Sequence, residues 1–201
     1  MKIFCVGRNY SDHAREMNAE VPADPVIFMK PETALVRNEK LYYPYFTQDL
    51  HYEGELVVKI AKNGKGIEPE YAGSYYDQIT LGLDLTARDI QQQLKKKGLP
   101  WELSKSFDHS AVIGDWIPVA PIISNPIEFE LRQNQKSVQK GSTRDMLFSI
   151  NQIVSYISRF FTLKTGDLIF TGTPAGVGPI QKGDVFEGFI NQNSVLKTTV
   201  Y

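Results

Sequence analysis

The sequence predicts an α+β protein in which strands dominate, and three observations support this fold class. Short runs with strand composition recur from one end of the chain to the other. Patterns typical of helices are few, and they do not alternate with strands as they do in a doubly wound parallel sheet. A chain of 201 residues can bury one full core. We therefore expect a single domain that covers residues 1–201.

The expected strands are apolar or alternating runs, most of which end at glycine, proline or polar turn residues. One of them forms a hairpin whose polar turn falls at residues 133–135, and two Gly-Asp turns, at Gly166 and Gly183, precede the last two strands. The expected strands cover residues 3–6, 26–29, 51–60, 79–85, 127–132, 168–170 and 185–189.

Two longer helices are expected. The first begins at Thr86-Ala87-Arg88-Asp89, which resembles a capping box, and ends before Gly98. The second spans about residues 144–160, where an apolar stripe recurs at helical spacing and is expected to face the core. The stripe consists of Leu147, Ile150, Val154, Ile157 and Phe161.

Composition and charge favour small-molecule chemistry. Hydrophobic residues make up 42% of the chain and charged residues 22%, and the formal net charge is −1. This balance provides no basic surface for nucleic acid or an anionic membrane. No apolar run approaches the ~20 residues of a membrane span, and the run 3–6 is too short for a signal peptide. We expect a cytoplasmic protein with no nucleic-acid or membrane partner, in which the single cysteine, Cys5, is a buried packing residue.

Acidic residues interrupt two of the expected strands. In the run 51–60, Glu53 and Glu55 point to the same face because strand side chains alternate. In the run 79–85, Asp84 projects away from the apolar face, and Gly82 next to it is expected to leave empty space for a ligand. The alternative for the glutamate pair is the solvated face of a half-buried strand. A carboxylate such as Asp84 within an apolar strand is costly unless something pairs with it.

If the fold brings these three acids together, a divalent cation would remove their mutual repulsion. Each pair of carboxylates at ~4 Å repels by roughly 4 kcal/mol at an effective dielectric constant near 20. A donor set made only of carboxylate oxygens suits a hard ion, which is Mg²⁺ or Mn²⁺, with Ca²⁺ as an alternative. The predicted metal ligands are therefore Glu53, Glu55 and Asp84.

A short polar helix is expected over residues 11–17, and two downstream prolines keep it short. The segment 9–25 could therefore act as a mobile lid. His13 and Glu16 are three residues apart, so they share a helix face on which the carboxylate can orient the imidazole of a general base. The alternative is a surface histidine beside a surface glutamate.

Further polar residues could contact a substrate. Arg88 and Gln91 share a face at the start of the helix, where free N–H groups favour an anion. Lys105 could oppose the negative charge of an oxyanion. The alternatives are a solvated helix face for Arg88 and Gln91 and an exposed loop lysine for Lys105. The glycine-rich segment 171–179 could approach a ligand closely or form a plain structural turn.

Taken together, these residues resemble the fumarylacetoacetate hydrolase family, and the small acylpyruvase and oxaloacetate decarboxylase-like branch is the nearest. The order and spacing of the motifs carry the resemblance over nearly the whole chain. The motifs are Gly7-Arg8-Asn9-Tyr10, His13 with Glu16, Glu53-x-Glu55, Asp84-Leu-Thr-Ala-Arg88-Asp89, Lys105-Ser106-Phe107 and Thr171-Gly-Thr-Pro-x-Gly-Val-Gly.

The resemblance implies a β-rich roll with mixed sheets, usually a homodimer, and Mg²⁺ or Mn²⁺ held by residues 53, 55 and 84. It implies that His13 and Glu16 form a catalytic dyad on a lid, and that Arg88, Gln91, Lys105 and Thr173 contact substrate. The larger members have a further aspartate upstream of the catalytic histidine, whereas residues 6–10 of this chain contain no acid. Fewer anionic ligands favour Mg²⁺ with several waters over Ca²⁺.

The leading hypothesis is metal-dependent cleavage of a C–C bond in a small 2-oxo acid, by acylpyruvate hydrolysis or oxaloacetate decarboxylation, through an enolate whose charge the cation and Lys105 oppose. An isomerase or tautomerase acting on 2-hydroxyhepta-2,4-diene-1,7-dioate or oxaloacetate would use the same enolate. An alternative of another class is a cation-binding module without catalytic activity, which would leave the spacing of His13 and Glu16 unexplained.

Overall fold

The computed structural model describes residues 1–16, 21–37, 40–120, 122 and 125–201. Its strands form three sheets, which contain both parallel and antiparallel pairs. The predicted strand-rich α+β class with mixed sheets is therefore confirmed. Among the described residues, no helix combines the length and the apolar character that crossing a membrane requires.

The largest sheet carries the site discussed below. β1 pairs in parallel with β13, β3 pairs in parallel with β9, and the other pairs are antiparallel. The strands run in the order β2 (Val26–Lys30), β1 (Ile3–Gly7), β13 (Leu168–Phe170), β6 (Gly54–Ile60), β7 (Tyr76–Asp84), β9 (Ala111–Ile113) and β3 (Leu35–Arg37), and β10 (Ile117–Pro118) also pairs with β7.

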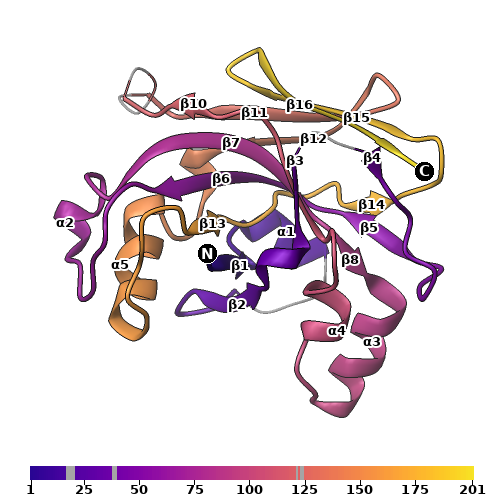
Figure 1. The fold of residues 1–201 in the computed structure, drawn as a ribbon, viewed down its shortest axis with the longest axis horizontal. Helices are drawn as coiled ribbons and strands as arrows, with labels where there is room; N and C mark the ends of the chain where they lie inside the picture. Colours follow the sequence, from indigo (N-terminus) through magenta and orange to yellow (C-terminus); the bar gives the residue numbers. More distant parts are fainter. Residues whose placement is uncertain (17–20, 38–39, 121, 123–124) are drawn as a thin grey trace.

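A second sheet of five strands packs on the first, and Figure 1 shows it stacked beside β6 and β7. Its order is β12 (Lys136–Ser142), β11 (Glu128–Gln133), β15 (Val185–Ile190), β16 (Asn193–Val200) and β4 (Lys40–Leu41). The main core includes buried side chains from both sheets, among them Leu56, Leu81, Leu131 and Phe186. A small third sheet joins β14 (Gly178–Pro179), β5 (Leu50–Tyr52) and β8 (Thr86–Ala87).

A second apolar cluster gathers buried side chains of the large sheet that lie outside the main core. Its members include Cys5, Val57 and Phe170, all fully buried. Cys5 is a buried free thiol, as predicted. Burial, followed by the nearby charge of Asp84, raises the pKa of this thiol well above its usual value.

Two pairs of short helices lie on opposite sides of the molecule, whereas α1 (Ser11–Glu16) lies between them (Figure 1). α2 (Pro69–Ala72) packs against α5 (Ile150–Phe160), and α3 (Arg88–Lys97) packs against α4 (Glu102–Lys105). The remaining helical segments are two 3₁₀ turns, Glu32–Ala34 and Thr143–Asp145.

Two predicted helix starts are wrong. Residues 86–87 form strand β8, so α3 begins at Arg88 without a side-chain cap, and the Asp89 carboxylate instead accepts a hydrogen bond from the Thr47 hydroxyl at 2.6 Å. The second helix begins at Ile150 rather than 144, because Ser149 and Gln152 form a capping box there. The predicted end of α3 is confirmed, since Gly98 adopts a left-handed conformation with φ +63°.

Candidate functional site

The three predicted acids lie at neighbouring ends of β6 and β7. Glu53 precedes β6, Glu55 is its second residue, and Asp84 is the last residue of β7. The backbone N–H of Asp84 donates to the carbonyl of Glu53 at 2.9 Å, which aligns the two strand ends. The predicted strand 51–60 is therefore two strands, β5 and β6, that are interrupted at Glu53.

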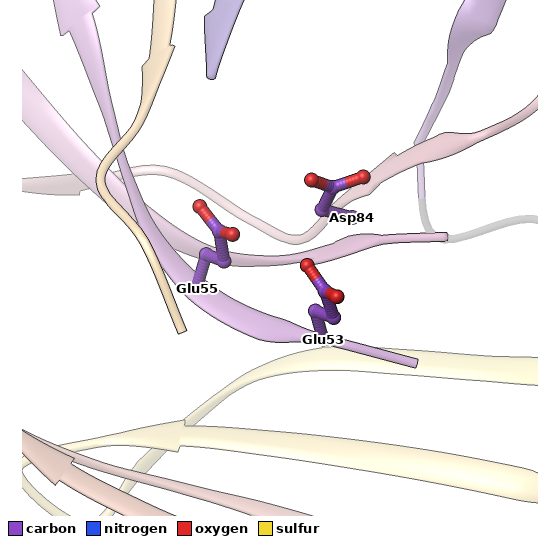
Figure 2. Close-up of side chains that lie close together, drawn as sticks. All are labelled: Glu53, Glu55 and Asp84. Atoms are coloured by element: carbon purple, nitrogen blue, oxygen red, sulfur yellow. The ribbon is translucent and has the colours of Figure 1, made fainter. Parts of the chain in front are cut away.

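The three carboxylates converge, as the sequence predicts. One carboxylate oxygen from each lies within 4.8 Å of the others, and Figure 2 shows the three side chains directed toward one shared space. The exposed fractions of Glu53, Glu55 and Asp84 are 6%, 1% and 1%, so the alternative of a solvated strand face does not apply.

The expected empty space beside Gly82 is absent. A Cβ atom at Gly82 would lie 2.8 Å from the side chains of Val57 and Phe170 and 2.7 Å from the carbonyl oxygen of Val112. The glycine therefore permits close packing of the sheet. The space that could hold a ligand lies instead in the pocket that the acids line.

Two lysines bridge the acids from the interior. The ammonium of Lys105 lies 2.7 Å from Glu53 Oε2 and 2.8 Å from Asp84 Oδ2. The ammonium of Lys30 lies 2.8 Å from Asp84 Oδ1 and also donates to the backbone carbonyls of Lys105 and Ser110. Both lysines are buried, so the alternative of an exposed loop lysine at position 105 is wrong.

Lys30 was missed by the sequence analysis. It ends the apolar strand β2 immediately before Pro31, a position at which a lysine commonly extends into solvent. No local signal marks it as buried, because its partner Asp84 lies on a distant strand.

Arg88 and Gln91 form one unit with Glu53. Arg88 Nη2 lies 2.5 Å from Glu53 Oε1, and Arg88 Nη1 donates to Gln91 Oε1 at 3.0 Å. Both side chains are buried, so they do not form a solvated helix face. The structure thus assigns Arg88 an ion pair with a predicted metal ligand.

Glu55 differs from the other two acids because, among the described residues, it makes no ion pair. Its Oε2 accepts a hydrogen bond from the backbone N–H of Gly172 at 2.7 Å. Burial, and then the charges of Asp84 and Glu53, raise its pKa well above the usual value. A hard divalent cation would stabilise this carboxylate in its charged form, so the donor set fits Mg²⁺ or Mn²⁺.

Lys105 retains its charge in this site. Burial lowers its pKa, but the adjacent carboxylates of Asp84 and Glu53 outweigh burial, and the net pKa is raised. The side chain therefore presents a positive charge to the pocket near neutral pH.

The glycine-rich segment is bound to the start of β6. The Thr173 hydroxyl donates to the Gly54 carbonyl at 2.9 Å and accepts from the Gln139 side chain at 2.8 Å. The Gln139 side chain also accepts from the Gly54 N–H at 2.8 Å. Gln139 is a supporting residue that the sequence analysis missed, since the hairpin that carries it showed no sign of chemistry.

The α1 helix lies against the same segment. The Glu16 carboxylate accepts a hydrogen bond from the N–H of Gly176 at 3.1 Å. The side chain of His13 and part of the predicted lid, residues 9–25, lie outside the described residues. The pairing of His13 with Glu16 and the motion of the lid therefore stay predictions.

One pocket with a volume of about 50 Å³ unites most of these groups. Its lining contains six of the predicted site residues, namely Glu53, Glu55, Asp84, Gln91, Lys105 and Thr173. It also contains residues that the sequence analysis did not assign to the site, including Arg8, Phe28, Lys95 and Trp101. The arrangement can hold a hard cation and place a fixed ammonium group beside it.

Known proteins resemble this chain over most of its length. The family model described as fumarylacetoacetate (FAA) hydrolase C-terminal matches residues 2–201. The mouse (Mus musculus) protein named oxaloacetate tautomerase FAHD1, mitochondrial, is 44% identical over 191 residues, which cover 94% of this chain and 86% of the mouse protein.

Two solved structures are similar in fold and in sequence. Fumarylpyruvate hydrolase from Pseudomonas aeruginosa in complex with Mn²⁺ and pyruvate superposes with a TM-score of 0.94 and 38% identity, and the match covers 100% of this chain and 89% of that one. 2-Hydroxyhepta-2,4-diene-1,7-dioate isomerase from Mycobacterium marinum superposes with a TM-score of 0.86 and 37% identity, and the match covers 99% and 73% of the two chains.

Proposed function

Because the chain belongs to the fumarylacetoacetate hydrolase family, we propose that it is a metal-dependent enzyme that interconverts the keto and enol forms of a 2-oxo acid of the oxaloacetate type. The observation that carries this proposal is the buried cluster of Glu53, Glu55 and Asp84 with the ammonium of Lys105 between two of its members. The 44% identity to a protein named oxaloacetate tautomerase supports the choice of reaction.

In this proposal Glu53, Glu55 and Asp84 hold Mg²⁺ or Mn²⁺. The bound cation supplies a Lewis acid that stabilises negative charge on a substrate oxygen. Lys105 adds a fixed positive charge on the same side of the pocket, where it opposes the charge of the enolate. Arg88 and Gln91 orient Glu53, and the Thr173 hydroxyl contacts the substrate.

His13 and Glu16 are proposed to move the proton. Tautomerisation removes a proton from the carbon next to the keto group and adds one to the keto oxygen, or the reverse, so it needs a group that exchanges protons near neutral pH, which histidine provides. Glu16 would orient the imidazole. The hydrogen bond from Gly176 to Glu16 supports this role, because it holds α1 against the segment that carries Thr173.

Cleavage of a C–C bond is the second candidate. A solved structure 38% identical to this chain is named fumarylpyruvate hydrolase and contains Mn²⁺ and pyruvate. Decarboxylation of oxaloacetate would release CO₂, and hydrolysis of an acylpyruvate would release a carboxylic acid. Both would leave the enolate of pyruvate, which carries its negative charge on the corresponding keto oxygen, so the same residues would stabilise it. Hydrolysis additionally requires His13 to activate water.

A substrate panel separates these reactions. The purified protein is given enolic oxaloacetate, acetylpyruvate and fumarylpyruvate, each with Mg²⁺, with Mn²⁺ and with a chelator, and the products are identified by NMR. We expect metal-dependent loss of enolic oxaloacetate without release of CO₂, and Lys105→Met should slow this by about a hundredfold. Lys97→Met, at an exposed position near the end of α3, should not change the rate. Pyruvate as the main product would favour C–C cleavage. Metal binding without any reaction would support the non-catalytic module and reject both candidates.

A further inference from the structure

Lys30 supplies an ammonium group to the acidic cluster from the interior of the protein. Its Nζ lies 2.8 Å from Asp84 Oδ1 and 3.1 Å from both the hydroxyl and the carbonyl oxygen of Ser110. It also donates to the backbone carbonyl of Lys105, the last residue of α4, and lies 3.5 Å from the carbonyl oxygen of Leu85. Because the Lys30 side chain is fully buried, these oxygens hold its charge in one place.

The two lysines that pair with Asp84 differ in their access to the pocket. Lys105 lines the pocket, but Lys30 does not. A ligand in the pocket can therefore contact Lys105, whereas Lys30 acts on the cluster through Asp84 and the end of α4. The proposed chemistry assigns no task to Lys30, although a buried ammonium group is costly for a protein to keep.

The acidic cluster and its ion-pair partners can balance one another in charge. When all three acids are ionised they carry three negative charges, and three buried cations, Lys30, Lys105 and Arg88, pair with two of them. The other charged side chains that line the pocket, Arg8 and Lys95, are also positive. A divalent cation held by the three acids would therefore add two positive charges to a buried site, and the surrounding side chains would not compensate them.

We propose that Lys30 is a fixed counter-charge for Asp84 that makes tight metal binding depend on an anionic 2-oxo acid. Lys30 weakens the binding of the free divalent ion, because like charges repel strongly in a site of low dielectric constant. The carboxylate of the 2-oxo acid offsets part of the added charge, so the metal and the substrate each strengthen the binding of the other. This inference rests on the proposed function, because it needs the 2-oxo acid to bind at the cluster together with the cation.

Metal affinity measured with a charged and with a neutral ligand tests this coupling. Pyruvate and pyruvamide both have a keto oxygen next to a second oxygen, but only pyruvate is an anion. The affinity for Mn²⁺ is measured by calorimetry without ligand, with excess pyruvate and with excess pyruvamide.

The variants separate the charge of Lys30 from its contacts. Lys30→Gln removes the charge and keeps a hydrogen-bond donor, Lys30→Met removes both, and Lys30→Arg keeps the charge. The control Lys197→Gln removes the same charge from an exposed position on the five-stranded sheet. Circular dichroism first establishes that each variant is folded.

In the wild type, pyruvate should tighten the binding of Mn²⁺ by about tenfold or more, and pyruvamide should tighten it by less than about threefold. Lys30→Gln should bind Mn²⁺ alone about tenfold more tightly than the wild type, because one like charge is removed, and should gain less from pyruvate. Lys30→Arg and Lys197→Gln should each stay within about twofold of the wild type. Replacement of a residue that only stabilises the fold would not improve metal binding.

Unchanged or weaker binding of Mn²⁺ alone to Lys30→Gln and Lys30→Met would overturn the inference and leave the proposed function standing. Equal tightening of the wild type by pyruvate and pyruvamide would also overturn it, because chelation rather than charge would then cause the coupling. This second comparison needs no variant, so it decides the question if neither neutral variant folds. Failure of the wild type to bind Mn²⁺ under all three conditions would overturn the proposed function together with the inference.

Discussion

The acidic pair at the start of β6 and the acidic pair of β11 share the pattern Glu-x-Glu but differ in their surroundings. Glu53 and Glu55 are buried and meet Asp84 in a common cluster. Glu128 is exposed and Glu130 half-buried, and both line a groove of about 640 Å³ on the outer face of the five-stranded sheet. The smaller, buried pocket is therefore the one in which carboxylates converge.

The pKa values of the two regions shift in opposite directions. Burial and neighbouring acids raise the pKa of Glu55, whereas hydrogen bonds from Arg132 and Ser137 lower the pKa of Glu130. The partner of Glu130 is two residues away in the same strand, but the partners of the buried cluster come from β2, α3 and α4. The pattern alone therefore does not determine the chemistry. The chemistry depends also on whether other parts of the fold bury the acidic pair and on which charged side chains from distant elements contact it.

The largest expected difference concerns catalysis. Glu55→Gln should lower the rate of metal-dependent enolisation on the order of a thousandfold, because a lost metal ligand removes several kcal/mol of charge stabilisation. Glu130→Gln should leave the rate within about twofold. Calorimetric titration with Mn²⁺ should show binding to Glu130→Gln and none to Glu55→Gln. Comparable rates in the two variants would remove the functional distinction between the regions.

The next difference concerns stability. Lys30→Met should lower the free energy of unfolding by about 3 kcal/mol, because it leaves Oδ1 of the buried Asp84 without its cation, while Lys105 still pairs with Oδ2. Lys197→Met removes an exposed partner of Glu187, 3.6 Å away on the five-stranded sheet, and should cost less than about 1 kcal/mol. Urea denaturation monitored by fluorescence measures both. A cost below 1 kcal/mol for Lys30→Met would mean that the buried ion pairs are not needed for folding.

The smallest difference separates two glycines with similar backbones. Gly172 and Gly183 have φ values of +99° and +94°, so alanine at either position should cost roughly 1–2 kcal/mol of backbone strain. A Cβ at Gly172 would lie 2.6 Å from the Cβ of Asn9, whereas nothing lies within 4 Å at Gly183. Gly172→Ala should therefore cost about 1–3 kcal/mol more than Gly183→Ala in the same urea experiment. Equal costs would show that the contact with Asn9 relaxes freely.

The convergence of the acids could be predicted because it depends on local alternation. Glu53 and Glu55 share a strand face, and Asp84 interrupts an apolar strand, so both signals lie within a few residues. The strand-rich fold class and the end of α3 at Gly98 follow from equally local signals.

The supporting residues could not be predicted, since their partners are set by tertiary pairing. Lys30 and Gln139 occupy ordinary strand positions and reach the site only because distant strands align beside it. The same cause explains the wrong capping box: Thr86 pairs with His51 in the small sheet instead of capping α3. The joint action of His13 and Glu16 stays a prediction, because the sequence shows only that the two residues are three positions apart in α1.

The position of β13 has a consequence for biosynthesis. This strand inserts between β1 and β6 and pairs residues 165 positions apart, such as Ile3 with Leu168. A nascent chain on the ribosome therefore holds β1 and β6 as unpaired, aggregation-prone edges until residue 170 emerges. High contact order of this kind slows folding, so the appearance of enzymatic turnover during translation would report that β13 has inserted between β1 and β6.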